Sequence, residues 1–155
     1  MNDCEILKIV AGQFAESEDM MDDWTRIRTG FRHLGYDPPG GGYIDVFVKL
    51  LTKEYEFIVT DLGETLFEMK TKFGKRSPRQ QRWISNACLI YGIECDEDVL
   101  QIRKSFDHKN PLLNAAEIVY AINCLARTAS KVEAPGRVFY SLEDGNFIED
   151  PVDSE

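Results

Sequence analysis

The sequence lacks the cysteine and histidine patterns by which metal sites and nucleophilic enzymes are often recognised. Its four cysteines form no C-x-x-C pair and have no histidine at zinc-ligand spacing. The two histidines, His33 and His108, have no serine or cysteine partner nearby in the sequence, so we expect both to be surface residues. We interpret the cysteines as reduced thiols and expect no cofactor.

Long hydrophobic runs are also absent. The sequence contains no run of about twenty apolar residues, the length that a helix needs to span a bilayer. The first residues lack the positive start and apolar run of a secretory signal. We therefore expect a cytoplasmic protein without membrane association. The 155 residues, 43% hydrophobic and 29% charged, suit one soluble domain. We expect this domain to span residues 1–149, with residues 150–155 as a loose acidic tail.

Basic residues are fewer than acidic ones, 18 against 27, and the resulting net charge of −9 disfavours direct binding to nucleic acid. The charges are nevertheless grouped along the chain, which predicts surfaces of opposite sign. The predicted basic surface comprises Arg26, Arg28, Arg32, Lys70, Lys72, Lys75, Arg76, Arg79 and Arg82. The predicted acidic surface comprises Glu18, Asp19, Asp22, Asp23, Asp96, Glu97 and Asp98. Both sets are candidate binding surfaces, and ordinary solvated faces are the alternative interpretation.

Alternating side chains predict a hairpin in the first half of the chain. Residues 43–50 and 54–60 each place apolar side chains on one face, and a short polar break joins them. Asp61 ends the second strand and Glu64 follows three residues later. This spacing favours a helix start at which Asp61 caps free amides while Glu64 reaches back.

Other segments carry clear helix signals. Ser77-Pro78 and Asn110-Pro111 are typical helix starts, because the first residue caps amides and proline needs no donor. Residues 112–126 carry one charge, Glu117, which indicates a buried helix lying across the sheet. We also expect a first helix ending near Glu16, an acidic link over residues 17–23, strands over residues 24–31 and 100–106, and a C-terminal hairpin of residues 138–140 and 146–148.

Together these patterns predict an α+β fold, in which about four helices flank a small antiparallel sheet of about three to four strands. The run Tyr-Ile-Asp-Val at residues 43–46, followed by Thr-Asp-Leu-Gly-Glu-Thr-Leu at residues 60–66, resembles an uncharacterised domain family of phages and bacteria. The resemblance extends over residues 24–129 and includes Ile-Tyr-Gly-Ile at residues 90–93. It implies no particular activity. It does imply phage or mobile-element biology, in which a small protein binds and modulates a host component.

Carboxylates near the hairpin suggest an alternative function. Asp45, Asp61 and Glu64 lie near strand ends, where metal-dependent nucleases place their acidic ligands. The lysine of the common Asp…Glu-x-Lys arrangement is missing after both Glu54 and Glu56. We therefore assign these carboxylates to capping and to the solvated surface, with a metal-dependent nucleic-acid enzyme as the alternative.

The sequence thus predicts a non-enzymatic protein-interaction module. Its expected partner is a protein, such as a host defence component or a nucleic-acid-associated host complex, which it would inhibit or modulate through its charged surfaces. Weak direct binding to nucleic acid is a further alternative, and salt-sensitive retention on single strands would support it.

Overall fold

A six-stranded antiparallel sheet forms one layer of the fold. The computed structural model describes residues 3–33, 42–106, 109–133, 139–140 and 147–148. In spatial order the strands are β1 (Glu16–Asp19), β2 (Thr25–Arg32), β3 (Tyr43–Leu51), β4 (Glu56–Thr60), β6 (Val99–Ser105) and β5 (Glu94–Asp96). The predicted α+β class and the antiparallel pairing are confirmed.

The predicted number of strands is wrong, because two short edge strands have no hydrophobic pattern. Every residue of β1 and of β5 is exposed, so neither strand shows the alternation that reveals a half-buried strand. They form by pairing with longer neighbours: Glu16 lies opposite Arg28, and Cys95 lies opposite Leu100. The first helix ends at Ala11 and not near Glu16, where β1 begins. The acidic link expected over residues 17–23 is therefore partly a strand.

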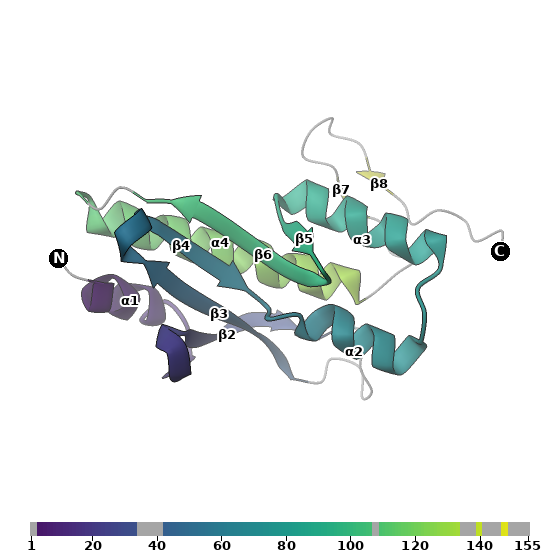
Figure 1. Ribbon diagram of the computed structural model, residues 1–155, viewed down its shortest axis with the longest axis horizontal. Coiled ribbons are helices and arrows are strands. Elements are labelled where there is room, and N and C mark those ends of the chain that lie inside the picture. Colours follow the sequence, from purple (N-terminus) through teal and green to yellow (C-terminus); the bar gives the residue numbers. More distant parts are fainter. Residues whose placement is uncertain (1–2, 34–41, 107–108, 134–138, 141–146, 149–155) are drawn as a thin grey trace.

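The inner face of the sheet carries the hydrophobic core. Ile27 lies opposite Val46, Val48 opposite Val59, and Val59 opposite Ile102, so buried apolar side chains align across four strands. The helix α4 (Pro111–Val132) packs across these same strands. Figure 1 shows α4 lying behind the strands and running along the sheet. The predicted position of this helix is confirmed.

Three more α-helices complete the described part of the chain, in agreement with the expected four. The helices α1 (Asp3–Ala11) and α3 (Pro78–Tyr91) contact α4, and α2 (Glu64–Phe73) contacts β6. Two short 3-10 turns, η1 (Met21–Asp23) and η2 (Thr52–Glu54), join strands. In Figure 1, α1 lies at the left-hand end of the molecule, while α2 and α3 lie at the right-hand end.

The predicted helix starts are confirmed by their hydrogen bonds. Ser77 Oγ accepts from the Gln80 amide at 3.1 Å, and the Gln80 side chain accepts from the Ser77 amide at 2.9 Å. Asn110 Oδ1 accepts from the Leu113 amide at 3.2 Å. Gly92 ends α3 in the left-handed region with a φ of 69°.

The C-terminal hairpin is also confirmed in its strands. β7 (Phe139–Tyr140) pairs with β8 (Phe147–Ile148) as a separate two-stranded sheet. The connection between these two strands and the expected acidic tail lie outside the described residues.

Candidate functional site

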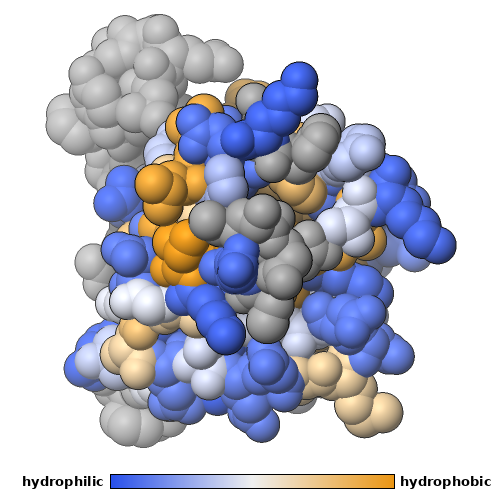
Figure 2. Space-filling model, turned by 90° about the vertical axis from the view of Figure 1, so that its left-hand side faces the viewer, coloured by the Kyte–Doolittle hydropathy of each residue, from blue (hydrophilic) through white to orange (hydrophobic). Residues whose placement is uncertain are grey.

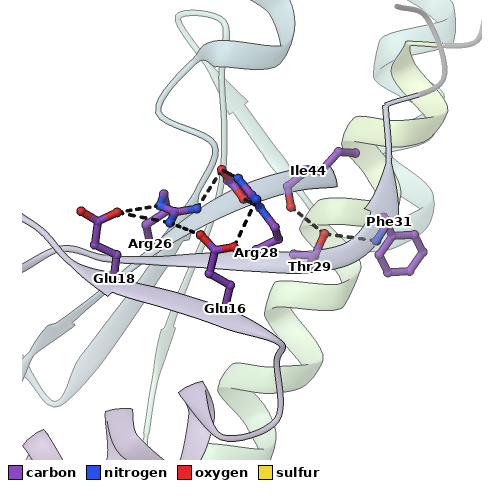
Figure 3. Close-up of polar contacts among 8 residues, drawn as sticks. Glu16, Glu18, Arg26, Arg28, Thr29, Phe31 and Ile44 are labelled. Atoms are coloured by element: carbon purple, nitrogen blue, oxygen red, sulfur yellow. Dashed lines mark hydrogen bonds and ion pairs between the residues drawn. The ribbon is translucent and has the colours of Figure 1, made fainter. Parts of the chain in front are cut away.

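A network of ion pairs covers part of the outer face of the sheet (Figure 3). Arg26 lies between Glu16 and Asp45, with nitrogen–oxygen distances of 2.8 and 3.1 Å. Arg28 contacts the same two carboxylates at 3.2 and 3.1 Å. Glu18 binds Arg26 from the edge strand at 3.2 Å. Strand register causes this grouping, because Glu16 lies opposite Arg28, Glu18 opposite Arg26, and Arg28 opposite Asp45.

The network stabilises the charged forms of Glu16, Arg26 and Arg28. The hydrogen bond from Arg26 to Glu16, together with the positive charge of Arg28, lowers the pKa of the Glu16 carboxyl. Hydrogen bonding to Glu16 raises the pKa of Arg26, and hydrogen bonding to Asp45 raises that of Arg28. Two members of the predicted basic surface therefore use their donors inside the molecule. The third arginine of that row, Arg32, is exposed and donates from Nη2 to Tyr43 Oη at 3.0 Å.

Asp61 connects the sheet to the start of α2. Its Oδ1 accepts from the amides of Gly63 and Leu100 at 2.8 and 3.1 Å, and its Oδ2 accepts from the Thr65 amide at 3.1 Å. Asp61 is 1% exposed. The helix begins at Glu64 with Gly63 at its N-cap position, so Asp61 is not the N-cap residue that the spacing predicted. Its carboxylate does accept from an amide of the first helical turn, as expected, and the additional bond to Leu100 ties β6 to the same carboxylate. Glu64 makes no side-chain hydrogen bond to the described residues, so it does not reach back as expected.

The three carboxylates of the alternative metal site do not form an open cluster. Asp45 binds two arginines, whereas Asp61 is occupied by three amides. Glu64 is exposed as a residue, yet partial burial of its carboxyl and the charges of Asp61 and Asp45 raise its pKa. Within the described ranges, no group of three or more His, Cys, Asp or Glu side chains is placed to hold a metal ion.

His33 is half-buried and contacts a buried carboxylate, so it is not the freely exposed surface residue that we expected. Its Nδ1 lies 2.7 Å from Glu133 Oε1, and the Glu133 side chain is fully buried. Nearby, Ser130 Oγ donates to the Arg32 carbonyl at 3.1 Å. These bonds attach the end of β2 to the end of α4. The second histidine, His108, lies outside the described residues.

Unpaired positive charge remains on α2, α3 and the loop between them. Lys70, Lys75 and Arg82 are exposed, and none of them forms an ion pair with a described residue. Arg76 instead pairs with Asp98 at 2.5 Å, and Arg79 is half-buried. The Lys72 side chain lies outside the described part of the structure. The predicted basic surface is therefore reduced here to three freely exposed positions.

Glu18 pairs with Arg26 in the network, and the other predicted acidic residues fall into two places. Asp19, Asp22 and Asp23 lie at the β1–η1 end of the sheet and are exposed. Asp96 and Glu97 are exposed at the β5 hairpin, beside the Arg76–Asp98 pair. Asp22 and Asp23 have φ values of 62° and 65°, a backbone region that aspartate tolerates better than most residues.

The residues between α1 and the sheet form a groove that the sequence analysis did not find. It has a volume of about 590 Å³ and is lined by apolar side chains and by carboxylates. The lining residues come from α1, β1, β2, β3 and the turns η1 and η2, so no single stretch of sequence contains the pattern. The available signal is the run Met20-Met21 placed between aspartates and followed by Trp24.

The helix α4 is not buried on all sides, which corrects the expectation from its composition. Leu112 and Tyr120 are 68% and 64% exposed, and Leu113 is also exposed. The sheet covers one side of α4, and α1 and α3 flank it, so its remaining side meets solvent. Figure 2 shows a compact hydrophobic area on the end of the molecule at which α4 begins.

Comparison with known proteins gives no relative from which a function could be taken. No family model, curated protein sequence or solved structure matches the chain. None of the helices in the described ranges has the length and apolar character needed to cross a bilayer.

Proposed function

We propose that the chain is a non-enzymatic protein-interaction module that binds its partner through charged surfaces. The observation that carries this proposal is that some charged side chains are paired within the molecule, while others are exposed without an ion-pair partner among the described residues. Asp45 and Asp61, the carboxylates best placed for chemistry, are held by arginines and by backbone amides. Exposed charges that form no ion pair with a described residue include those on α2–α3 and around η1.

The two surfaces have opposite signs and lie on different elements. Lys70, Lys75 and Arg82 form the basic surface, and Asp22 and Asp23 belong to the acidic one. Charge complementarity of this kind selects partners and speeds their encounter, more than it adds to affinity. The net charge of −9 argues against direct binding to nucleic acid.

The partner that we propose is a host protein, in line with the resemblance of residues 24–129 to a phage and bacterial domain family. Binding would inhibit or modulate that protein, for example a defence component or a subunit of a nucleic-acid-associated complex. The proposed compartment is the cytoplasm. Cys88, Cys95 and Cys124 are free thiols, as is usual in a reducing compartment, and burial raises the pKa of Cys88 to about 12.

Affinity capture from a bacterial lysate, followed by mass spectrometry, tests the proposal. The variant Lys70→Glu/Lys75→Glu/Arg82→Glu reverses the free basic positions without touching the Arg76–Asp98 pair. A control variant, Lys53→Glu/Lys104→Glu, reverses two other exposed positions. We expect the wild type and the control to retain the same partner and the α2–α3 variant to lose it.

Two results would contradict the proposed function. One is a partner profile that is unchanged both by the α2–α3 variant and by removal of the carboxylates around η1. The other is cleavage of DNA or RNA by the purified protein in the presence of magnesium or manganese, which would favour the enzyme alternative.

A further inference from the structure

Apolar side chains contribute part of the lining of the groove between α1 and the sheet. Methionine is flexible and tryptophan offers a large apolar face, so both suit an apolar ligand. Next to the groove, Met21 is 85% exposed. Figure 2 looks at this end of the molecule, where α1 and η1 lie, and shows hydrophilic surface interrupted by pale orange hydrophobic side chains. The apolar lining residues are Leu7, Ala11, Met20, Trp24 and Leu50.

Two carboxylates also line the groove, and a third lies next to it in the chain. Asp19 and Asp23 line the groove, and Asp22 precedes Asp23 in η1. Asp19 accepts a hydrogen bond from Thr25 Oγ1 at 3.4 Å, while Asp22 and Asp23 have no ion pair with any described residue. Two cations lie close to the groove: Lys8 is among the lining residues, and Lys49 Nζ lies 5.5 Å from the centroid of the Trp24 ring. The three aspartates of the rim outnumber these two cations, whereas the charges of the neighbouring β1 glutamates are compensated by Arg26.

We propose that this groove binds a basic segment of a partner protein that carries one large apolar side chain as its anchor. The apolar side chain enters the groove against Met20 and Trp24, and flanking lysines or arginines face the three aspartates. The inference rests on the proposed function, since it assigns a partner chemistry to one of the two charged surfaces. A nucleic-acid strand does not fit this site, because its phosphates would lie against carboxylates.

A direct binding measurement with the full chain tests the assignment. The probe is a short synthetic peptide of lysines and arginines around a central leucine, and fluorescence anisotropy of a labelled copy reports its binding. We expect the basic peptide to bind. Replacing its leucine with glycine removes the apolar anchor and should weaken binding by about tenfold or more. A third peptide, with glutamates in place of the basic residues, should not bind.

Intrinsic fluorescence locates the bound peptide. The chain has two tryptophans, of which Trp24 lines the groove and Trp83 is 1% exposed in the core. Peptide binding should shift the emission of Trp24 to shorter wavelength, because the anchor displaces water from the indole. The Trp83→Phe variant should show the same shift. Peptide binding without any change in Trp24 emission would overturn the assignment to this groove.

Two variants test the charges and the cavity separately. The variant Asp19→Asn/Asp22→Asn/Asp23→Asn removes the rim charge, and asparagine tolerates the positive φ of Asp22 and Asp23. We expect about tenfold weaker binding of the basic peptide. The control Glu94→Gln/Asp96→Asn/Glu97→Gln removes the same number of exposed carboxylates at β5 and should bind normally. Unchanged binding to the rim variant would overturn the proposal.

The second variant, Ser17→Trp, tests the cavity by placing a large side chain in the groove from an exposed strand position. It should abolish peptide binding while the circular dichroism spectrum stays that of the wild type. Full binding to a folded Ser17→Trp protein would also overturn the proposal.

The proposed function and the partner assignment fail in different ways. If the basic peptide does not bind but the α2–α3 variant still loses its captured partner, the groove assignment is wrong and the interaction module stands. Sedimentation of the free protein distinguishes one further occupant. If the free protein self-associates and the rim variant does not, the basic α2–α3 surface of a second copy occupies the groove. That result would overturn the proposal that the groove binds a different protein.

Discussion

Asp61 is the residue on which three elements depend. It follows β4, precedes α2, and accepts an amide hydrogen from β6. A buried carboxylate with three amide donors is costly to replace, because each amide left without a partner loses a hydrogen bond that water cannot supply. The same occupation explains why Asp61 is poorly placed as a metal ligand. Its two oxygens already accept three hydrogen bonds from the backbone.

Replacing Asp61 with alanine should lower the free energy of unfolding by about 3 kcal/mol or more, because three buried amides lose their acceptor. The Asp61→Asn variant should lose less, since its carbonyl oxygen can still accept from Gly63 and Leu100 while its amino group faces the Thr65 amide. Urea denaturation measures both values. Equal stability of Asp61→Ala and the wild type would show that the carboxylate is not a folding group.

The raised pKa of Glu64 predicts how the free energy of unfolding depends on pH. Because partial burial and neighbouring carboxylates raise its pKa in the folded protein, folding opposes ionisation of this carboxyl. The penalty is absent below the ordinary glutamate pKa of about 4.3 and grows as the pH rises through the higher folded value. The Glu64→Gln variant should therefore be more stable than the wild type at neutral pH, with a difference that shrinks toward acid pH. Urea denaturation midpoints of the wild type and the variant, measured at neutral and at acid pH, test the sign of this difference in stability.

At the scale of elements, β1 depends on ion pairs more than on packing. All four of its residues are exposed, so it contributes little to the hydrophobic core. Its backbone pairs with β2, and its glutamates bind Arg26, whose side chain is only 15% exposed. Exposed ion pairs contribute little individually, yet several carboxylates sharing partly buried arginines form a network that holds an edge strand.

The Arg26→Met variant tests this dependence. It keeps an unbranched side chain on β2 but removes the charge that Glu16, Glu18 and Asp45 share. We expect faster hydrogen exchange of the β1 amides, with little change in β4. The control Arg103→Met breaks the Arg103–Glu56 pair on the other half of the sheet and should leave β1 exchange unchanged. Equal protection of β1 in the wild type and in Arg26→Met would show that backbone pairing alone holds the strand.

The same elements show how far the sequence determines the fold and the site. Caps at Ser77 and Asn110 are local, so their residues specify the helix starts without tertiary information. β1 and β5 depend on partners distant in the chain and show no periodicity of their own. The charged residues were predictable, but which charges are neutralised depends on strand register. The groove was not predictable, because six elements contribute to it.

At the scale of the whole molecule, the fold consists of a sheet with helices packed on its inner face. This arrangement buries one side of α4 deeply, and Ile118, Ile122 and Leu125 are fully buried there. It also leaves the opposite side of α4 without a covering layer in the described structure. A long helix with few charges therefore supplies core and exposed apolar surface at once.

Two substitutions on α4 distinguish its two sides. Ile118→Ala should lower the free energy of unfolding by about 2–5 kcal/mol, because it removes buried methyl groups and leaves a cavity. Leu112→Gln replaces a residue that is 68% exposed and should change stability by less than about 0.5 kcal/mol. Urea denaturation of both variants provides the comparison. If Leu112→Gln is as destabilising as Ile118→Ala, another part of the protein covers this side of α4 in solution, and the one-sided arrangement of the helices is incomplete.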